Sequence, residues 1–191
     1  MKFKLLLTLL FLPTVAFLQP AKDADVLHYK NQSYPDIKLL LTDSATIFTE
    51  IDLPKDKTVV FIFFSPDCDH CQQTANELVK KMDSLKDIIM VWNGPSYLPL
   101  ADTKSFYERY QLINYPNIIM GKEMAYYMPI FYRIEITPFA AIYKNGMFYT
   151  ELRNGITVKD LIAISNNTYT IPNYPSIIIE EKKKNKKGKK K

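Results

Sequence analysis

Long apolar blocks mark the secondary structure in the middle of the chain. Residues 58–64 are almost continuously apolar, β-branched and aromatic, which predicts a strand buried on both faces. Residues 88–92 form a second block of this kind and are followed by the breaker run 93–95. Between the blocks, apolar residues recur at steps of four and three, which predicts a helix with one buried stripe. The members of this stripe are Cys71, Ala75, Leu78, Met82 and Leu85.

Weaker patterns complete the series of elements on both sides of these blocks. Asn145-Gly146 is a strong signal for the turn of a β-hairpin, and Thr157 begins a run that resembles a capping box. The remaining predicted elements are an N-terminal hairpin with strands at 37–41 and 45–48, a helix at 102–112, a strand at 117–120, a short helix at 123–132, strands at 139–143 and 147–152, and a helix at 157–165.

The order of these elements predicts how the sheet is connected. A strand, a helix and a second strand in succession require parallel pairing through a right-handed crossover. The later hairpin adds antiparallel strands to the same sheet. The sequence therefore predicts an α/β sandwich built on a mixed sheet.

The N-terminus has the pattern of a secretory signal peptide. Lys2 and Lys4 precede an apolar stretch at 5–18, which is shorter than the roughly 20 residues of a membrane span. Small residues permit cleavage after Ala16, or at a later position up to residue 21. We therefore interpret residues 1–19 as a signal for export to the periplasm or another extracytoplasmic compartment. An uncleaved anchor and a buried N-terminal helix are the alternatives.

The C-terminus changes composition abruptly. Residues 170–191 combine a Pro-containing linker with a Lys-rich tail, in which residues 180–191 hold eight Lys and two Glu. Such a charge block cannot bury itself, so we expect it to be disordered. It either makes weak electrostatic contact with an anionic surface or is a solvated tail without a specific partner.

Composition excludes several classes of protein. The 191 residues are 47% hydrophobic and 13% aromatic, which supports a packed core and excludes global disorder. The formal charge of +5 comes from the ends of the chain, because residues 20–179 carry 15 basic and 18 acidic residues and a net charge of −3. A basic nucleic-acid-binding body is therefore not expected. With two Cys and two His, neither a disulfide scaffold nor a four-ligand zinc site is expected.

The candidate chemistry lies at residues 68–71, which read Cys-Asp-His-Cys. A Cys-x-x-Cys motif after a buried strand and at the start of a helix is more specific than the four letters alone. Positions three apart on a helix are neighbours, so the two sulfurs can meet. Helix N-termini favour thiolate over thiol, and thiolate is the nucleophile of thiol–disulfide exchange. We expect an exposed attacking Cys68 and a shielded resolving Cys71.

Charged neighbours act on this pair in opposite directions. A protonated His70 would stabilise the Cys68 thiolate, whereas nearby Asp67 and Asp69 carboxylates would disfavour it. A static structural disulfide is an alternative, although the small loop that it would close adds little stability. A metal site is not expected, because His28 is the only His outside the motif.

Thr137-Pro138, just before the strand at 139–143, is the second element of the pattern. With the order of elements and the Cys-x-x-Cys motif, it makes residues 37–165 resemble the thioredoxin superfamily. That resemblance implies a three-layer sandwich with helices on both faces of the sheet, an N-terminal hairpin extension and a domain at about residues 26–166. It also implies that Pro138 is a cis-proline beside the two sulfurs and that the Thr137 backbone pairs with substrate. Within the superfamily, the hairpin and the insertion at 102–132 are similar to exported TlpA-type redoxins.

The chain departs from the family pattern at two positions near the motif. Asp67 stands where the family has Trp, and Ile62 stands where thioredoxins carry a buried Asp. Glu123 and Glu135 are candidate proton acceptors for Cys71 by sequence order only. An aromatic group within residues 126–132 either lines a substrate groove or belongs to the core, and Trp92 is expected in the core.

These patterns predict an exported thiol–disulfide oxidoreductase, more in keeping with a TlpA-type reductase, that needs no cofactor. It would act on protein thiols and disulfides and exchange electrons with a thiol partner in the membrane or periplasm. The first alternative is a non-catalytic binding module with a static disulfide. The second is a peroxiredoxin-like peroxidase, for which Ser65 fits the family pattern but Phe61 replaces the required Pro.

Overall fold

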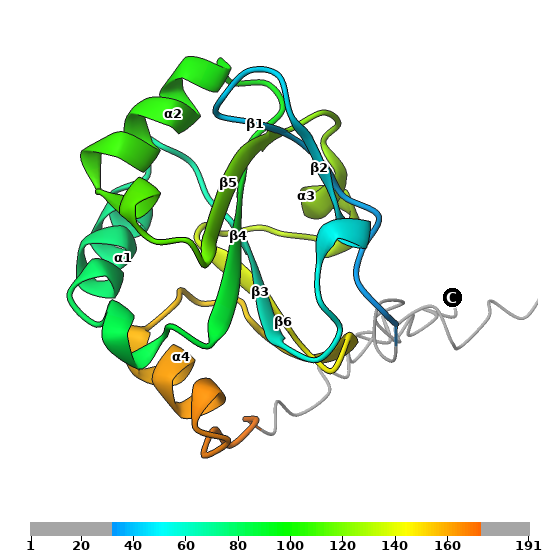
Figure 1. Ribbon diagram of the computed structural model, residues 1–191, viewed down its shortest axis with the longest axis vertical. Coiled ribbons are helices and arrows are strands. Elements are labelled where there is room, and N and C mark those ends of the chain that lie inside the picture. The colour runs from blue at the N-terminus through cyan, green and yellow to red at the C-terminus, as the bar shows by residue number, and fades with distance from the viewer. Residues whose placement is uncertain (1–31, 173–191) are drawn as a thin grey trace, which may run out of the picture.

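A seven-stranded mixed sheet forms the centre of the molecule (Figure 1). The computed structural model describes residues 32–172; the interpreted signal peptide at 1–19 and the tail from residue 173 onward lie outside this range. Within it, no helix has the length and apolarity that crossing a membrane requires. The strands are β1 (Lys38–Leu41), β2 (Ile47–Thr49), β3 (Thr58–Phe63), β4 (Ile88–Gly94), β5 (Ile118–Glu123), β6 (Phe139–Lys144) and β7 (Met147–Leu152).

The sheet has the order β2-β1-β5-β4-β3-β6-β7. Strands β3, β4 and β5 are parallel, as the strand–helix–strand order predicts, and β6 and β7 add the expected antiparallel hairpin. The predicted N-terminal hairpin is also present, since β1 pairs with β2 on one side and with β5 on the other. The carboxyl ends of the parallel strands therefore share one edge of the sheet, which is where sites form in α/β folds.

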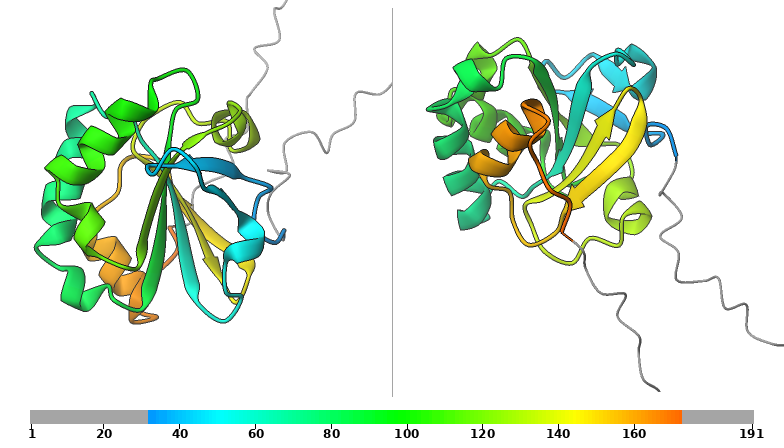
Figure 2. Two further views of the ribbon diagram at one scale, coloured as in Figure 1. Left: turned by 45° about the horizontal axis from the view of Figure 1, so that its top comes forward. Right: turned by 90° about the horizontal axis from the view of Figure 1, so that it is seen from below.

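Helices cover both faces of the sheet, so the predicted three-layer arrangement is confirmed (Figures 1 and 2). Two parallel crossovers of the same hand place their helices on the same face, and the return to β6 crosses the other face. The helices are α1 (Asp69–Val79), α2 (Leu100–Arg109) and α4 (Val158–Ser165) on one face, α3 (Tyr127–Phe131) on the other, and short 3-10 helices at Glu50–Asp52, Met82–Ser84 and Leu112–Asn114.

Alternate residues of β3 supply the two hydrophobic cores. Val60 and Ile62 pack with the core that includes the buried faces of α1 and α4. Val59, Phe61 and Phe63 pack with α3 and β1 on the opposite face. All five side chains are buried, so the apolar run in the sequence does mark a strand that is covered on both sides.

Two helices end earlier than the apolar periodicity predicts. The stripe from Cys71 to Leu85 divides, because α1 ends at Val79 and a separate 3-10 turn carries Met82. Met82 and Leu85 are nevertheless buried in the same core. The predicted helix at 102–112 spans Leu100–Arg109 instead, because Gln111 has a left-handed backbone that ends it.

The predicted short helix at 123–132 is partly wrong. Glu123 is the last residue of β5 and pairs with Leu39 of β1, so the helix begins only at Tyr127. Likewise, Asn93 and Gly94 continue β4 beyond its predicted end because they pair with Gly121 and Lys122. In both cases, partner strands distant in sequence decide the assignment, and a local pattern carries no information about them.

Gly121 is required where β5 lies against β1. A Cβ atom at this position would lie 2.8 Å from the Leu40 carbonyl oxygen and 3.0 Å from the Leu39 Cβ. We expect Gly121→Ala to lower the free energy of unfolding by about 1–3 kcal/mol, because backbone must move to admit the methyl group. Urea unfolding measures this, with the neighbouring Lys122→Ala as the control. Equal stabilities of the two variants would contradict the account.

Candidate functional site

The register of β3 and β6 creates the candidate site. Phe63, the last residue of β3, pairs antiparallel with Phe139, the first residue of β6. The chain leaving β3 toward Cys68 therefore lies opposite the chain entering β6 through Thr137-Pro138. The peptide bond between Thr137 and Pro138 is cis, in agreement with the resemblance described above.

Cys68 is the N-cap of α1, and its sulfur faces two backbone groups. The Cys71 N–H donates to Cys68 Sγ at 3.3 Å, which gives one of the free amides of the helix N-terminus a partner. The Cys68 thiol in turn donates to the Thr137 carbonyl oxygen at 3.6 Å. Both cysteines are free thiols, Cys68 half-buried and Cys71 buried. The structure thus brings together Cys68, Cys71 and the residues of the cis-proline loop.

The two thiols have opposite electrostatic properties. Partial burial would raise the pKa of Cys68, but the hydrogen bonds from Cys71 and from the backbone of His70 outweigh burial, and the net pKa lies below that of an ordinary thiol. Complete burial raises the pKa of Cys71 to about 12, with a further contribution from Cys68. The pair therefore combines one thiol that ionises more readily than an ordinary cysteine with one that remains protonated at neutral pH.

The charged residues of the motif all point toward solvent. His70, Asp67 and Asp69 are exposed, and Asp67 accepts a hydrogen bond from the Ser65 hydroxyl. His70 acts on Cys68 through its backbone amide, which is one of the groups that lower the thiol pKa. Between residues 32 and 172, no group of three or more His, Cys, Asp or Glu side chains is placed to hold a metal ion.

A groove with a volume of about 260 Å³ runs along the cis-proline side of the site. His70 and Thr74 of α1 form one wall, and Thr137 and Pro138 form another. The third wall is the loop at 154–157, whose position beside the two cysteines no local sequence pattern indicates. The Thr74 hydroxyl connects these walls, because it donates to the His70 carbonyl at 2.8 Å and lies 3.5 Å from the Ile156 carbonyl oxygen.

Neither candidate proton acceptor lies beside Cys71. Glu123 is on the opposite face of the sheet from α1, where the Met128 N–H donates to one of its carboxylate oxygens at 3.0 Å. Glu135 is exposed on the loop before Ile136. Ile62, at the position of the buried Asp of thioredoxins, packs in the same apolar core as Cys71. Cys71 consequently has an apolar environment on the sheet side.

The aromatic group at 126–132 divides between the core and the surface. Met128 and Tyr132 are buried, and the Tyr132 hydroxyl hydrogen-bonds the Tyr143 hydroxyl at 2.7 Å. Tyr126 is 44% exposed and makes ring contacts with Phe63 and Tyr97, next to the site edge of the sheet. Trp92 is fully buried, as expected.

The difference between the two thiols can be measured by alkylation. We expect iodoacetamide to modify Cys68 of the reduced protein with a pH midpoint below the roughly 8.5 of a free thiol, because hydrogen bonds to the sulfur stabilise its thiolate. In Cys68→Ser, Cys71 should remain unmodified at pH 8. Faster labelling of Cys71 than of Cys68 in the native protein would contradict the assignment of an accessible thiolate to Cys68.

Glu123 should make stability depend on pH. Burial raises the pKa of Glu123 to about 7, well above its value in the unfolded chain. Between these two pKa values, the folded protein keeps the carboxyl group protonated, whereas the unfolded chain has lost the proton. Its contribution to stability is complete below about pH 4.5 and is lost as pH rises to 7. Between pH 5 and pH 8, the loss is about 2 kcal/mol. Urea unfolding of Glu123→Gln should lack this slope, whereas exposed Glu135→Gln should retain it; parallel slopes in all three proteins would refute the expectation.

Comparison with known proteins identifies the fold. No protein-family model and no curated protein matches this sequence. Among solved structures, the thioredoxin domain of a thiol-disulfide oxidoreductase from Bacteroides vulgatus is similar with a TM-score of 0.58 and 17% identity, over 74% of this chain and 98% of that one. A secreted disulfide oxidoreductase from Mycobacterium tuberculosis, homologous to E. coli DsbE, has a TM-score of 0.55 and 18% identity, over 70% and 94% of the two chains.

A peroxiredoxin has a similar fold. The 2-Cys peroxiredoxin of Plasmodium vivax matches with a TM-score of 0.53 and 14% identity, over 72% of this chain and 80% of that one. Similarity at these identities shows the fold and does not select among activities. The sheet order, the Cys-x-x-Cys motif at the start of α1 and the cis-proline opposite it agree with these matches. The chain therefore has the thioredoxin-like fold that its sequence pattern predicts.

Proposed function

We propose that this protein is an exported thiol–disulfide oxidoreductase that acts on protein disulfides and dithiols through Cys68 and Cys71. The observation that carries the proposal is the placement of Cys68 Sγ, 3.3 Å from the Cys71 amide and 3.6 Å from the Thr137 carbonyl oxygen of the cis-proline loop. One thiol with a lowered pKa is open to a partner, and the second is buried within reach of the first. In thiol–disulfide exchange, a thiolate attacks the substrate disulfide, and a second thiol within reach can then resolve the mixed disulfide.

In the first step, the Cys68 thiolate attacks one sulfur of a substrate disulfide. A bond forms between Cys68 and that sulfur, the substrate disulfide bond breaks, and the other substrate sulfur leaves as a thiolate that takes a proton from solvent. The free N–H groups at the start of α1 stabilise the attacking thiolate. The groove beside Thr137 and Pro138 holds the substrate chain, with the Thr137 backbone as its hydrogen-bonding partner.

In the second step, Cys71 attacks Cys68 Sγ and releases the reduced substrate. The product is a Cys68–Cys71 disulfide, so two electrons pass from the pair to the substrate. The negative charge on Cys68 and its hydrogen bond both contribute to the high pKa of Cys71. Formation of the mixed disulfide removes that charge, so the pKa of Cys71 falls at the point where its thiolate is needed. The proton leaves to solvent, since Ile62 supplies no acceptor on the sheet side.

Net electron flow toward substrate requires a donor dithiol to reduce the pair again. We propose a membrane or periplasmic thiol partner for this role and a reductase of the TlpA type, in keeping with the signal-like N-terminus and the N-terminal hairpin. A reduction potential near −270 mV, measured against glutathione, supports this direction, whereas a value near −120 mV indicates an oxidase. A pair that does not equilibrate with glutathione indicates a binding module instead.

Trapping distinguishes the roles of the two cysteines. Cys71→Ser should accumulate a mixed disulfide with a disulfide-containing protein substrate such as insulin, because it lacks the thiol that resolves the intermediate. Cys68→Ser should trap nothing and should lose essentially all reductase activity. Gel shift under non-reducing conditions, reversed by dithiothreitol, measures the adduct. Equal trapping by both variants would contradict the proposed division of roles.

A further inference from the structure

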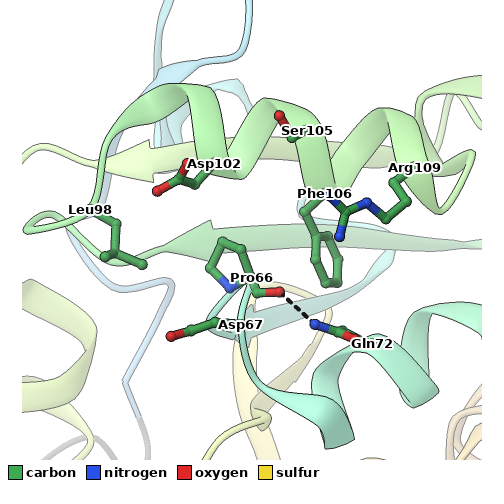
Figure 3. Close-up of a pocket in the computed structure, with 8 residues that line it drawn as sticks. All are labelled: Pro66, Asp67, Gln72, Leu98, Asp102, Ser105, Phe106 and Arg109. Atoms are coloured by element: carbon green, nitrogen blue, oxygen red, sulfur yellow. Dashed lines mark hydrogen bonds between the residues drawn. The ribbon is translucent and has the colours of Figure 1, made fainter.

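We call residues 64–68, which connect β3 to α1 and include Cys68, the active-site loop. A second cleft opens on the other side of this loop from the groove, between the loop and α2 (Figure 3). We call it the α2 cleft. It has a volume of about 470 Å³ and is separate from the groove along the cis-proline loop. The lining residues used below are Asp67, Gln72, Asp102, Ser105, Phe106 and Arg109.

The α2 cleft adjoins the nucleophile. Asp67, in its wall, directly precedes Cys68, and the Gln72 side-chain amide donates to the Pro66 carbonyl oxygen at 3.0 Å. This hydrogen bond fixes the floor of the cleft to the first turn of α1. Cys68 therefore lies between the groove and the cleft, and a polypeptide that presents a disulfide to Cys68 can extend into both.

Opposite charges stand at the two ends of the cleft. Asp102 and Arg109 are seven residues apart on one face of α2, which separates them by about 10 Å along the helix axis. In Figure 3, Asp102 on α2 and Asp67 on the opposite wall lie on the same side of the cleft as Leu98, and Arg109 and Gln72 lie toward the other side. Within the described chain, the ion pairs involve other residues, so Asp102 and Arg109 make none with each other. The acidic end is the one that contains the residue next to Cys68.

We propose that the α2 cleft is a specificity subsite that binds the substrate segment flanking the reacting cysteine and selects a basic side chain at its acidic end. This inference rests on the proposed function and deepens it by naming the substrate class. The 10 Å between the charged ends corresponds to about three residues of extended chain, so Arg109 favours an acidic residue three positions beyond the basic one. Asp102 acts here as a specificity-determining residue that does not touch the reacting sulfurs.

The experiment uses the full chain and three peptides. Each peptide has one cysteine in a mixed disulfide with a small thiol, and the peptides differ only in the residue next to that cysteine. The variable residue is Lys, Gln or Glu. We expect the second-order rate constant at low salt to be about fivefold higher for the Lys peptide than for the Glu peptide, a ratio that 0.5 M salt reduces toward one. Asp102→Asn should lower the ratio of the Lys-peptide to the Glu-peptide rate constant toward one. Asp102→Lys should make the Glu peptide the faster substrate.

Matched controls separate the subsite from other effects. Glu108→Gln removes an acidic residue of α2 whose partner is Lys104 on another face, and it should retain the wild-type ratio. The Gln peptide should react at the same rate with wild type and Asp102→Asn. An unchanged Lys-to-Glu ratio in Asp102→Asn would overturn the proposal. So would an equal loss of rate with all three peptides, since Asp102 would then act on the fold or on Cys68.

Binding keeps the test independent of catalysis. The same peptides with Ser in place of Cys are titrated into the full chain, and affinity is measured by fluorescence anisotropy. Tighter binding of the Lys peptide to wild type than to Asp102→Asn supports the subsite, even if no peptide disulfide is reduced and the proposed function fails. Equal affinity of the Lys and Glu peptides for wild type overturns the subsite while leaving the redox function intact.

Discussion

The antiparallel register between β3 and β6 is the constraint on which the site depends. Pairing of Phe63 with Phe139 sets the end of one central strand opposite the start of its neighbour. It brings Cys68 within 3.6 Å of a carbonyl 69 positions further along the chain. Because both strands are buried on both faces, a shift of register by one residue would move each side chain out of its own core and into the core on the opposite face. The core therefore stabilises the alignment of the sulfur and the cis-proline loop.

Burial gives the thiols of Cys68 and Cys71 different reactivities. Cys68 sits at the helix N-terminus at the surface, where amides contact its sulfur, and Cys71 lies one turn further along on the buried stripe of α1. The first thiol belongs to the N-cap residue at the exposed end of α1, and the second lies one turn further along, where the helix packs on the sheet. The same helix therefore leaves the first thiol accessible and buries the second. Reactivity is thus a consequence of where the helix begins relative to the sheet.

The two depressions on either side of Cys68 have different origins. The groove is formed by the cis-proline loop and the loop at 154–157, which close on α1 from the β6 side of the sheet. The α2 cleft exists because the crossover from β4 to β5 places α2 on the same face as α1. A right-handed topology consequently provides a second surface beside the nucleophile. The exposed α2 residues Asp102 and Arg109 lie on this surface, whereas Thr103 and Phe106 are buried.

The sequence by itself determined the element types, the mixed sheet and the Cys-x-x-Cys pair, because these depend on local periodicity and on residues close together in the chain. The cis peptide bond of Thr137-Pro138 and its position near the cysteines follow from the resemblance to a known family and not from a local pattern. The structure has this cis bond, with the Thr137 carbonyl oxygen 3.6 Å from Cys68 Sγ. Tertiary structure decided that Glu123 is in a strand, that Gln72 fixes the active-site loop, and that Asp102 and Arg109 share a cleft with Asp67. The reason is physical: strand pairing and helix packing join segments distant in sequence, and no local pattern records their register.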